Sequence, residues 1–510
     1  MKNRRIRLPL VTLLLAPLAI LHAAEPAPSP ARPNIIYILL DDAGYGDFGC
    51  YGQSAFTTPH VDKMAGEGMK FTRHYAGAAV CAPSRTALIT GLHTGHSRVR
   101  ANGPATIPDT DLTVPRLLKD AGYQTACIGK YGLGMPLAPD DPKKKGFDYA
   151  FGYVDTAHAH NGYPTYLIRN GEKAMLDNQQ ILGSENKPGT GVATAEGRKQ
   201  WAPQLLADDV QQYLDQRAKD KSQPFFLYYT PILPHANNEA DETSPLGHGM
   251  ETPSYGEFTS RDWPDVQKGY ASAMRFVDNE VGAVLAKLKA LGLDDDTIVM
   301  LSSDNGPHKE GGNDPAFFKS NGGLTGIKRD LTEGGVRVPF VVRWPGKIKA
   351  GTISEHVSGF QDLMPTVADL SGGKVTSECD GISFLSTLLE KNEQQKKHDY
   401  LFWYGSEKGG KLAVLKWPWK LLHLNTGSTE ASDESGKPTA KKKVATPKPL
   451  VVQLFNLEDD PAESKNVAKE YPELVKELDA LMKQAWRNPS GAGESPAPLA
   501  VKTASDASQP

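Results

Sequence analysis

A continuous apolar run, Asn34–Leu40, constrains the fold of this 510-residue chain more than any other feature. An unbroken run rich in β-branched residues is typical of a strand covered on both faces, as in a parallel sheet. The run ends at an Asp-Asp pair (41–42), and a second run, Thr297–Leu301, leads into an Asp-Asn pair (304–305). Open α/β sheets bind ligands at the carboxyl ends of their strands. The sequence therefore predicts an α/β fold with a ligand site at that edge.

The two acidic pairs supply oxygen atoms suited to a hard cation. Asp41, Asp42, Asp304 and Asn305 offer the carboxylate and amide oxygens that Ca²⁺ and Mg²⁺ prefer as ligands. The alternative for the first pair is a turn, because two glycines follow it closely. We expect a metal site if both strands end at the same edge of the sheet.

A short segment from Cys81 to Gly91 predicts a helix whose start is suited to an anion. Pro83 has the fixed φ of a first helical residue, and Gly91 suits a helix C-terminus. Cys81 is therefore expected just before the helix, where backbone N–H groups attract anions. Arg85, one turn into the helix, offers a planar cationic group that matches a tetrahedral oxyanion. The alternative is a buried cysteine beside a loop.

The first residues have the pattern of a secretory signal peptide (1–24). Four basic residues precede an apolar run at 8–21, which ends at small residues near Ala24. The run is short for a membrane span, so we expect cleavage after it, no stable membrane anchor, and a periplasmic or secreted protein. Residues 25–33 are predicted to form a linker.

Overall charge excludes some classes of partner. The net charge is −3, so no nucleic-acid partner is expected and any attraction of an anionic substrate must be local.

Four cysteines in an oxidising compartment suggest two disulfides by default. Cys127 lies in an apolar strand and is expected to be a small buried hydrophobic residue.

Hydrophobic periodicity predicts the remaining elements. Residues 136–200 show weak periodicity and are expected to form substrate-side loops and short hairpins. Residues 426–449 are rich in Ser, Lys, Thr and Pro and are expected to be a disordered loop, with a low-complexity tail at 488–510. Helices are predicted at 59–68, 112–121, 202–218, 267–291 and 467–487, and strands at 122–130, 225–229, 338–344, 401–404 and 420–422.

The string from Cys81 to Gly91, Cys-Ala-Pro-Ser-Arg-Thr-Ala-Leu-Ile-Thr-Gly, resembles the signature of the type I, formylglycine-dependent, arylsulfatase-like sulfatases. Its one departure is Ile89, where Leu is usual. The resemblance implies that a formylglycine-generating (maturation) enzyme converts Cys81 to formylglycine, whose hydrated aldehyde is the nucleophile. At least one of the other cysteines then stays unpaired. The acidic pairs match the family's metal-binding segments, which implies that Ca²⁺ is coordinated by Asp41, Asp42, Asp304, Asn305 and the modified Cys81.

Further strings match the family in the same order along the chain. Lys130 ends a strand that resembles the second family signature, and Lys328 lies five residues before Glu-Gly-Gly. The resemblance implies that these lysines and Arg85 bind the sulfate group. His235, in a Pro-His pair, is implied to protonate the leaving oxygen.

One family position is not filled as usual. Gly132 stands where many members carry a histidine that helps to break down the sulfated intermediate. His308, three residues after Asn305, is the candidate replacement for that base. The alternative for His308 is a solvent-facing histidine in a turn.

Two loops are expected to meet the substrate, which the resemblance implies is a sulfated small molecule or oligosaccharide. One loop carries Arg98, Arg100 and Asn102, and the other carries His158 and His160. Two histidines at this spacing also suit half of a transition-metal site, but no partner ligand is evident nearby. A polar pocket wall is the favoured interpretation.

The resemblance implies an α/β, alkaline-phosphatase/sulfatase-like sandwich with a large mixed β-sheet flanked by helices. Residues 34–390 are assigned to this catalytic domain, and 391–487 to a smaller C-terminal antiparallel-sheet subdomain. The implied function is hydrolysis of sulfate esters, of a carbohydrate or of an aryl sulfate. Two alternatives stay open: a phosphate or phosphonate ester hydrolase of the same fold, and a catalytically inactive carbohydrate-binding relative.

Overall fold

A computed structural model describes most of the chain. The predicted signal peptide, nearly all of the predicted linker, the predicted disordered loop apart from its end residues, and the predicted tail lie outside the described residues. Within the described residues, no helix combines the length and the apolar character that crossing a bilayer requires. The described ranges are 32–103, 106–134, 138, 141–182, 190–407, 410–426 and 449–487.

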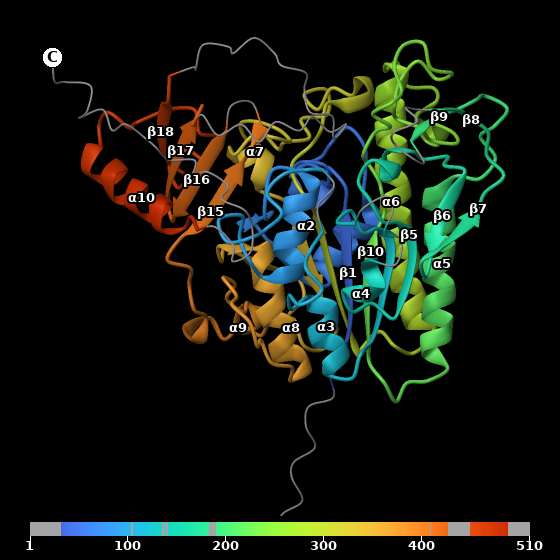
Figure 1. Cartoon of the computed structure of the whole chain (residues 1–510), viewed down its shortest axis with the longest axis horizontal. Coiled ribbons are helices and arrows are strands. Elements are labelled where there is room, and N and C mark those ends of the chain that lie inside the picture. The colour runs from blue at the N-terminus through green and yellow to red at the C-terminus, as the bar shows by residue number, and fades with distance from the viewer. Residues whose placement is uncertain are drawn as a thin grey trace, which may run out of the picture.

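A ten-stranded mixed sheet forms the centre of the molecule (Figure 1). Its strand order is β13-β2-β12-β11-β1-β10-β4-β5-β6-β7. The five central strands, from β11 to β5, are parallel, and antiparallel pairs occur on both sides of them. The strand bounds are β1 Asn34–Leu40, β2 Met69–Phe71, β4 Gln124–Lys130, β5 Tyr149–Tyr153, β6 Tyr166–Arg169, β7 Glu172–Met175, β10 Phe225–Thr230, β11 Thr297–Ser303, β12 Phe340–Arg343 and β13 Thr352–Ser354.

Alternate side chains of β1 enter two cores, one on each face of the sheet. Ile36 and Ile38 join the core formed with α1, α5 and α6, whereas Ile35 and Tyr37 join the core formed with α2, α3 and α8. Both faces are covered, which explains why the sequence of β1 is an unbroken apolar run. The helix bounds are α1 Pro59–Gly66, α2 Cys81–Thr90, α3 Val114–Asp120, α5 Ala202–Ala218, α6 Asp265–Ala290 and α8 Leu363–Ser371.

Shorter elements connect this framework. Residues 136–200 contain two antiparallel hairpins, β6 with β7 and β8 with β9, as expected. The same stretch also contains β5, which pairs parallel with β4 in the central sheet and was not predicted. The remaining bounds are β3 His74–Tyr75, β8 Gln180–Leu182, β9 Gly191–Ala193, β14 Ser358–Gly359, α4 Asp141–Lys144, α7 Glu333–Val336, α9 Leu385–Leu388, η1 Gly49–Tyr51, η2 His158–His160, η3 Gly256–Phe258, η4 Glu310–Gly312, η5 Phe360–Asp362 and η6 Asn392–Gln394.

A four-stranded antiparallel sheet lies at one side of the molecule and packs against α10 (Figure 1). Leu478 and Met482 are buried, whereas Tyr471 is 45% exposed. The helix begins at Pro472, later than predicted, because proline fits the first turn, where its missing N–H is not needed. The bounds are β15 Leu401–Gly405, β16 Lys411–Lys416, β17 Trp419–Leu424, β18 Val451–Asn456 and α10 Pro472–Gln484.

One further strand and the cysteines also differ from the expectations. Strand β16 was not predicted, because a four-residue apolar run between two lysines has too little periodicity to identify a strand. The four cysteines are all unpaired, so the default of two disulfides is wrong. Cys127 is 2% exposed, as expected of a small core residue.

Candidate active site

Neighbouring strands end at one edge of the central sheet and bring the predicted metal and sulfate residues together. β1 ends directly before Asp41 and Asp42, and the parallel strand β11 ends directly before Asp304. Lys130 is the last residue of β4, and β10 ends five residues before His235. All five side chains are buried.

Helix α2 places Cys81 beside this cluster. The helix begins at Cys81 itself rather than after it, because Val80 has the extended conformation of an N-cap residue (φ −147°, ψ 157°). Cys81 Sγ lies 3.4 Å from Asp41 Oδ1. Burial, together with the negative charge of Asp304, raises the pKa of the Cys81 thiol well above its ordinary value. Gly91 ends the helix with a φ of 72°, as expected of a C-terminal glycine.

Arg85 links the helix to both acidic pairs. Its Nε and Nη2 lie 3.0 and 2.8 Å from Asp304 Oδ2, and Nη2 lies 3.4 Å from Asp41 Oδ1. Nη1 donates to the backbone carbonyl of Lys130 at 2.7 Å. Burial opposes the charge of the guanidinium, but the carboxylates of Asp304 and Asp41 raise the pKa of Arg85 above its ordinary value. Arg85 therefore stays charged in a fully buried position.

Two lysines complete the charged cluster. Lys130 Nζ lies 2.8 Å from Asp41 Oδ2, and Lys328 Nζ lies 2.8 Å from Asp42 Oδ2. Burial alone would raise the pKa of Asp41, but Lys130 and neighbouring cations hold it well below the ordinary value. Burial and the charge of Asp41 raise the pKa of Asp304 to about 7. Three carboxyl groups thus face three cations, which gives the compensation that buried charges require.

His235 is oriented by one ring nitrogen and faces the cluster with the other. Nδ1 lies 2.6 Å from the carbonyl oxygen of Ala236, to which it donates. Nε2 lies 3.2 Å from Lys328 Nζ and 3.5 Å from Asp42 Oδ2. Burial, followed by the charge of Lys328, lowers the pKa of His235 well below its ordinary value. The ring of His160 stacks on that of His235, with 5.0 Å between centroids and 11° between planes.

His308 is fully buried, so the interpretation as a solvent-facing turn residue is wrong. Its Nε2 lies 3.0 Å from the carbonyl oxygen of Pro234, and its Nδ1 accepts from the N–H of Glu310 at 3.1 Å. Burial opposes protonation, but Glu310 Oε2, 3.2 Å from Nδ1, raises the pKa of His308. Both ring nitrogens are engaged, Nε2 with Pro234 and Nδ1 with Glu310. A role as base at residue 81 therefore requires one of these bonds to break.

The oxygen donors of the cluster fit a hard metal ion. Asn305 Nδ2 donates to Asp42 Oδ1 at 2.6 Å, while Asn305 Oδ1 is buried and has no hydrogen-bond partner. One ligand atom each from Asp41, Asp42, Cys81 and His235 lies within 4.8 Å of the others. An unsatisfied amide oxygen beside several carboxylates is the donor set that Ca²⁺ prefers. These residues are therefore suited to hold such an ion.

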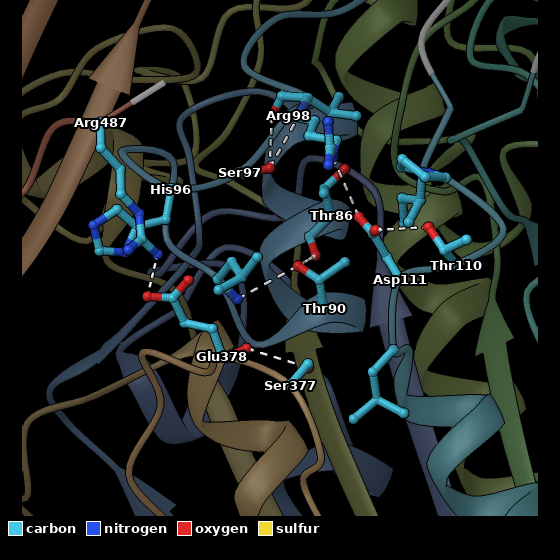
Figure 2. A pocket seen from close by; sticks show the side chains of 15 residues that line it. Thr86, Thr90, His96, Ser97, Arg98, Thr110, Asp111, Ser377, Glu378 and Arg487 are labelled. Atoms are coloured by element: carbon cyan, nitrogen blue, oxygen red, sulfur yellow. Dashed lines mark hydrogen bonds and ion pairs between the residues drawn. The ribbon is translucent and has the colours of Figure 1, made fainter. Parts of the chain in front are cut away.

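The two arginines that were expected to meet the substrate make other contacts. Arg98 lines a separate pocket of about 450 Å³, where its Nε lies 3.5 Å from Asp111 Oδ2 (Figure 2). Arg100 is buried and donates through Nη2 to the carbonyl oxygen of Arg487, with its guanidinium 4.0 Å from the ring centroid of Trp486. Both arginines join parts of the protein to one another, which differs from the predicted contact with substrate.

Of the other expected substrate residues, two lie at the cluster and one lies in the core. Asn102 Oδ1 accepts from the N–H of Ala82, next to Cys81, at 2.9 Å. His160 stacks on His235, as described above. His158 is 2% exposed, with its Nε2 3.0 Å from the carbonyl oxygen of Tyr166. Because His158 and His160 contact different groups, they do not form half of a transition-metal site.

Glu310 belongs to the site but was not identified from the sequence. Its carboxylate contacts Lys328, with 3.5 Å between Oε1 and Nζ, and also contacts Arg329 and His308. Burial alone would raise the pKa of Glu310, but Lys328 and then His308 hold it well below the ordinary value. Its sequence context, Lys-Glu-Gly-Gly, reads as an ordinary loop.

Comparisons with known proteins agree with this architecture. The profile of the family described as Sulfatase matches residues 33–373, and that of N-sulphoglucosamine sulphohydrolase, C-terminal, matches residues 327–431. Bovine (Bos taurus) arylsulfatase A is 31% identical over 500 residues, which cover 93% of this chain and 91% of that protein.

A bacterial relative and a solved structure are also similar. N-acetylgalactosamine-6-O-sulfatase of Bacteroides thetaiotaomicron is 29% identical over 517 residues, with 88% of this chain and 92% of that protein covered. The crystal structure of Ps i-CgsB in complex with k-i-k-neocarrahexaose superposes with a TM-score of 0.69 at 24% identity, and covers 91% of this chain and 95% of that chain. This likeness supports the alkaline-phosphatase/sulfatase-like fold.

Proposed function

The chain belongs to the sulfatase family of sulfuric ester hydrolases, and we propose that it hydrolyses the sulfate ester of a carbohydrate at the cluster around Cys81. One observation carries this proposal: Cys81, at the start of a buried helix, lies against a carboxylate that is itself bonded to Lys130 and Arg85. Fixed cations next to a reactive position are what a reaction at a tetrahedral oxyanion requires.

The residues of the cluster fit the two groups that sulfatase membership implies, a Ca²⁺ ion and a formylglycine at position 81. Ca²⁺ would be held by Asp41, Asp42, Asp304 and Asn305, and the unpartnered Asn305 Oδ1 supports this assignment. Formylglycine at position 81 would supply, when hydrated, the oxygen nucleophile that a hard-ion site accepts more readily than sulfur. Maturation by a formylglycine-generating enzyme is part of the proposal.

Arg85, Lys130 and Lys328 are proposed to bind the equatorial oxygens of the sulfate group. In the structure the two ammonium groups each bond a proposed metal ligand, Asp41 or Asp42. A divalent cation bound to those carboxylates would compensate their negative charge, so the two ammonium groups would lack a counter-ion. The sulfate ester would supply that negative charge. Metal and sulfate binding should therefore support each other.

His235 is proposed to protonate the leaving oxygen. Its Nδ1–H is fixed by the carbonyl of Ala236, so Nε2 is the atom directed at the cluster. Because the pKa of His235 is lowered, Nε2 carries no proton in the neutral ring and must gain one before it can donate. The negative charge of a bound sulfate ester would favour this second proton, and the anchored Nδ1–H keeps Nε2 directed at the leaving oxygen. The stacked ring of His160 and the side chain of Asn102 are the nearest candidates for contact with the sugar.

The substrate class is inferred from the relatives together with the polar wall of the site. One relative is named for a 6-O-sulfated N-acetylgalactosamine, and one fold neighbour was solved with a neocarrahexaose. We propose that this chain acts on a sulfated oligosaccharide. The basic and apolar start of the sequence supports export to the periplasm or the medium.

Two measurements test this function. Conversion of the Cys81 thiol to an aldehyde should lower the mass of the tryptic peptide by about 18 Da relative to the encoded sequence. The ratio of kcat/KM for an aryl sulfate to that for the matching aryl phosphate should exceed one. An unmodified thiol in active enzyme would refute the nucleophile, and a preference for phosphate would favour the phosphoester alternative.

A further inference from the structure

A second cavity lies at the start of α5 and shares no lining residue with the charged cluster. It encloses about 600 Å³ between the first turn of α5, the middle of α6 and the 252–258 loop. Four aromatic residues form part of its wall, Trp201, Tyr255, Phe258 and Phe276, and we name it the Trp201 pocket. Its volume lies within the range of small-ligand sites.

The aromatic rings of the Trp201 pocket are held in place. The rings of Trp201 and Phe276 meet edge to face, with 4.7 Å between centroids and 71° between planes. Trp201 Nε1–H donates to the carbonyl oxygen of Glu251 at 3.1 Å. Tyr255 and Phe276 are both partly exposed. Rigid aromatic rings of this kind offer apolar contact area to the C–H face of a pyranose at little entropic cost.

Polar groups around the rings suit a ligand that carries hydroxyl groups. Asn279 is exposed at the pocket, and its amide can both donate and accept hydrogen bonds. The hydroxyl oxygens of Thr252 and Ser272, two further wall residues, are buried without a hydrogen-bond partner. Because these two oxygens are enclosed, the hydrogen bonds that the pocket offers a ligand come from its exposed polar residues, Ser254 and Asn279.

The charges of the pocket favour an uncharged ligand. Arg275 Nε lies 2.7 Å from Glu257 Oε1, and Lys199 Nζ lies 3.0 Å from Asp177 Oδ2. Both wall cations are therefore already compensated by carboxylates. A sulfate group would have to displace one of these carboxylates, whereas a sugar with free hydroxyls would not.

Residues next to the pocket wall are bonded to the segments that follow His160 and His235. The N–H of Ala202, the first residue of α5, donates to the carbonyl oxygen of Gly162 at 2.9 Å, two residues after His160. Asn237, two residues after the proposed proton donor, donates through Nδ2 to Glu251 Oε2 at 3.0 Å. Two hydrogen bonds therefore connect the segments that form the pocket with the segments that carry His160 and His235.

We propose that the Trp201 pocket binds an uncharged sugar unit of the oligosaccharide whose sulfate ester is hydrolysed at residue 81. This inference rests on the proposed function and adds that the substrate is several units long. Binding in the pocket would raise kcat/KM for long substrates without contact with the reacting sulfate.

Direct binding is the first test, because it does not depend on catalysis. Calorimetry with a desulfated galactose-based hexasaccharide should give a measurable affinity for the wild-type protein. Tyr255→Ala should weaken it about five- to tenfold, as expected for the loss of one aromatic contact. Tyr255→Phe keeps the ring and should retain the affinity, which separates stacking from the 2.9 Å contact between the tyrosine hydroxyl and His248. No binding to wild type would overturn the proposal.

Kinetics provide the second test and separate the two proposals. For Tyr255→Ala, kcat/KM should fall about five- to tenfold on a sulfated hexasaccharide and stay unchanged on 4-nitrophenyl sulfate. Tyr471→Ala, an aromatic substitution at an exposed site in the C-terminal part, is the matched control and should change neither value. An equal loss of kcat/KM on both substrates, or no loss on either, would overturn the proposed sugar-binding role of the Trp201 pocket. A wild-type enzyme that hydrolyses no sulfate ester would instead overturn the proposed function.

Discussion

Lys420, a fully buried residue of β17, lies with its Nζ 2.8 Å from Glu333 Oε1 and joins the small sheet to the segment that carries Lys328. Glu333 begins α7, five residues after Lys328. Glu463 Oε1 lies 3.0 Å from the same Nζ, so one lysine contacts two buried carboxylates. The C-terminal sheet thereby supports the position of a proposed sulfate-binding residue.

Lys420→Met should destabilise the protein by about 3–5 kcal/mol, because Glu463 would be left buried without this cation and Glu333 would keep only Arg337, whose Nη1 lies 3.4 Å from its Oε2. Chemical unfolding measures this loss. Lys416→Met is a matched control, since its Nζ lies 2.6 Å from Glu477 Oε1 with both side chains about half exposed. The control should lose less than about 1 kcal/mol. Similar losses of unfolding free energy in the two variants would show that the buried contacts of Lys420 stabilise the protein no more than an exposed ion pair does.

Asp304→Ala should reduce kcat/KM on an aryl sulfate more than Lys328→Ala does. Asp304 bonds Arg85 and also accepts from the backbone N–H of Asp42 at 3.1 Å, so its removal disturbs several groups at once. Lys328 is one of three cations that share the charge of the sulfate, and its loss should cost about 10²–10³-fold. The reverse order would count against a central role for Asp304.

Removal of metal by a chelator should abolish turnover, and added Ca²⁺ should restore it, because the proposed ligands are oxygen donors. Elemental analysis gives a readout that is independent of activity. Wild-type protein should retain about one ion per chain, and Asn305→Ala should retain less. Asn178→Ala, another buried asparagine outside the site, should match wild type. Full activity of metal-free protein would refute the metal assignment.

The sequence predicted the framework of the site better than its surroundings. Asp41 and Lys130 come at the ends of buried strands, so the parallel sheet alone brings them to one edge. Arg100 was harder to interpret, because its contact with Trp486 joins residues 386 positions apart in the chain. No local pattern reports such a contact. Glu310 was missed for the same reason, since its partner Lys328 comes from another loop.

His308→Ala distinguishes two roles for this residue. If His308 is the base that replaces the histidine missing at Gly132, the first release of alcohol should keep its rate and only later turnover should slow. If it acts through its 3.0 Å contact with the carbonyl of Pro234, it positions His235. The first release of alcohol and the later steady-state turnover should then slow together. The engaged ring nitrogens favour the second outcome.

Rapid-quench kinetics with a series of aryl sulfates separates these outcomes for His308→Ala. A mispositioned His235 should slow esters of weakly acidic alcohols more than 4-nitrophenyl sulfate, because a poor leaving group depends more on protonation. His423→Ala, which alters a buried histidine of the C-terminal sheet, controls for a general loss of packing and should leave this dependence unchanged. An intact first phase with slow turnover would instead assign the base to His308, and unchanged kinetics in both phases would remove it from the reaction.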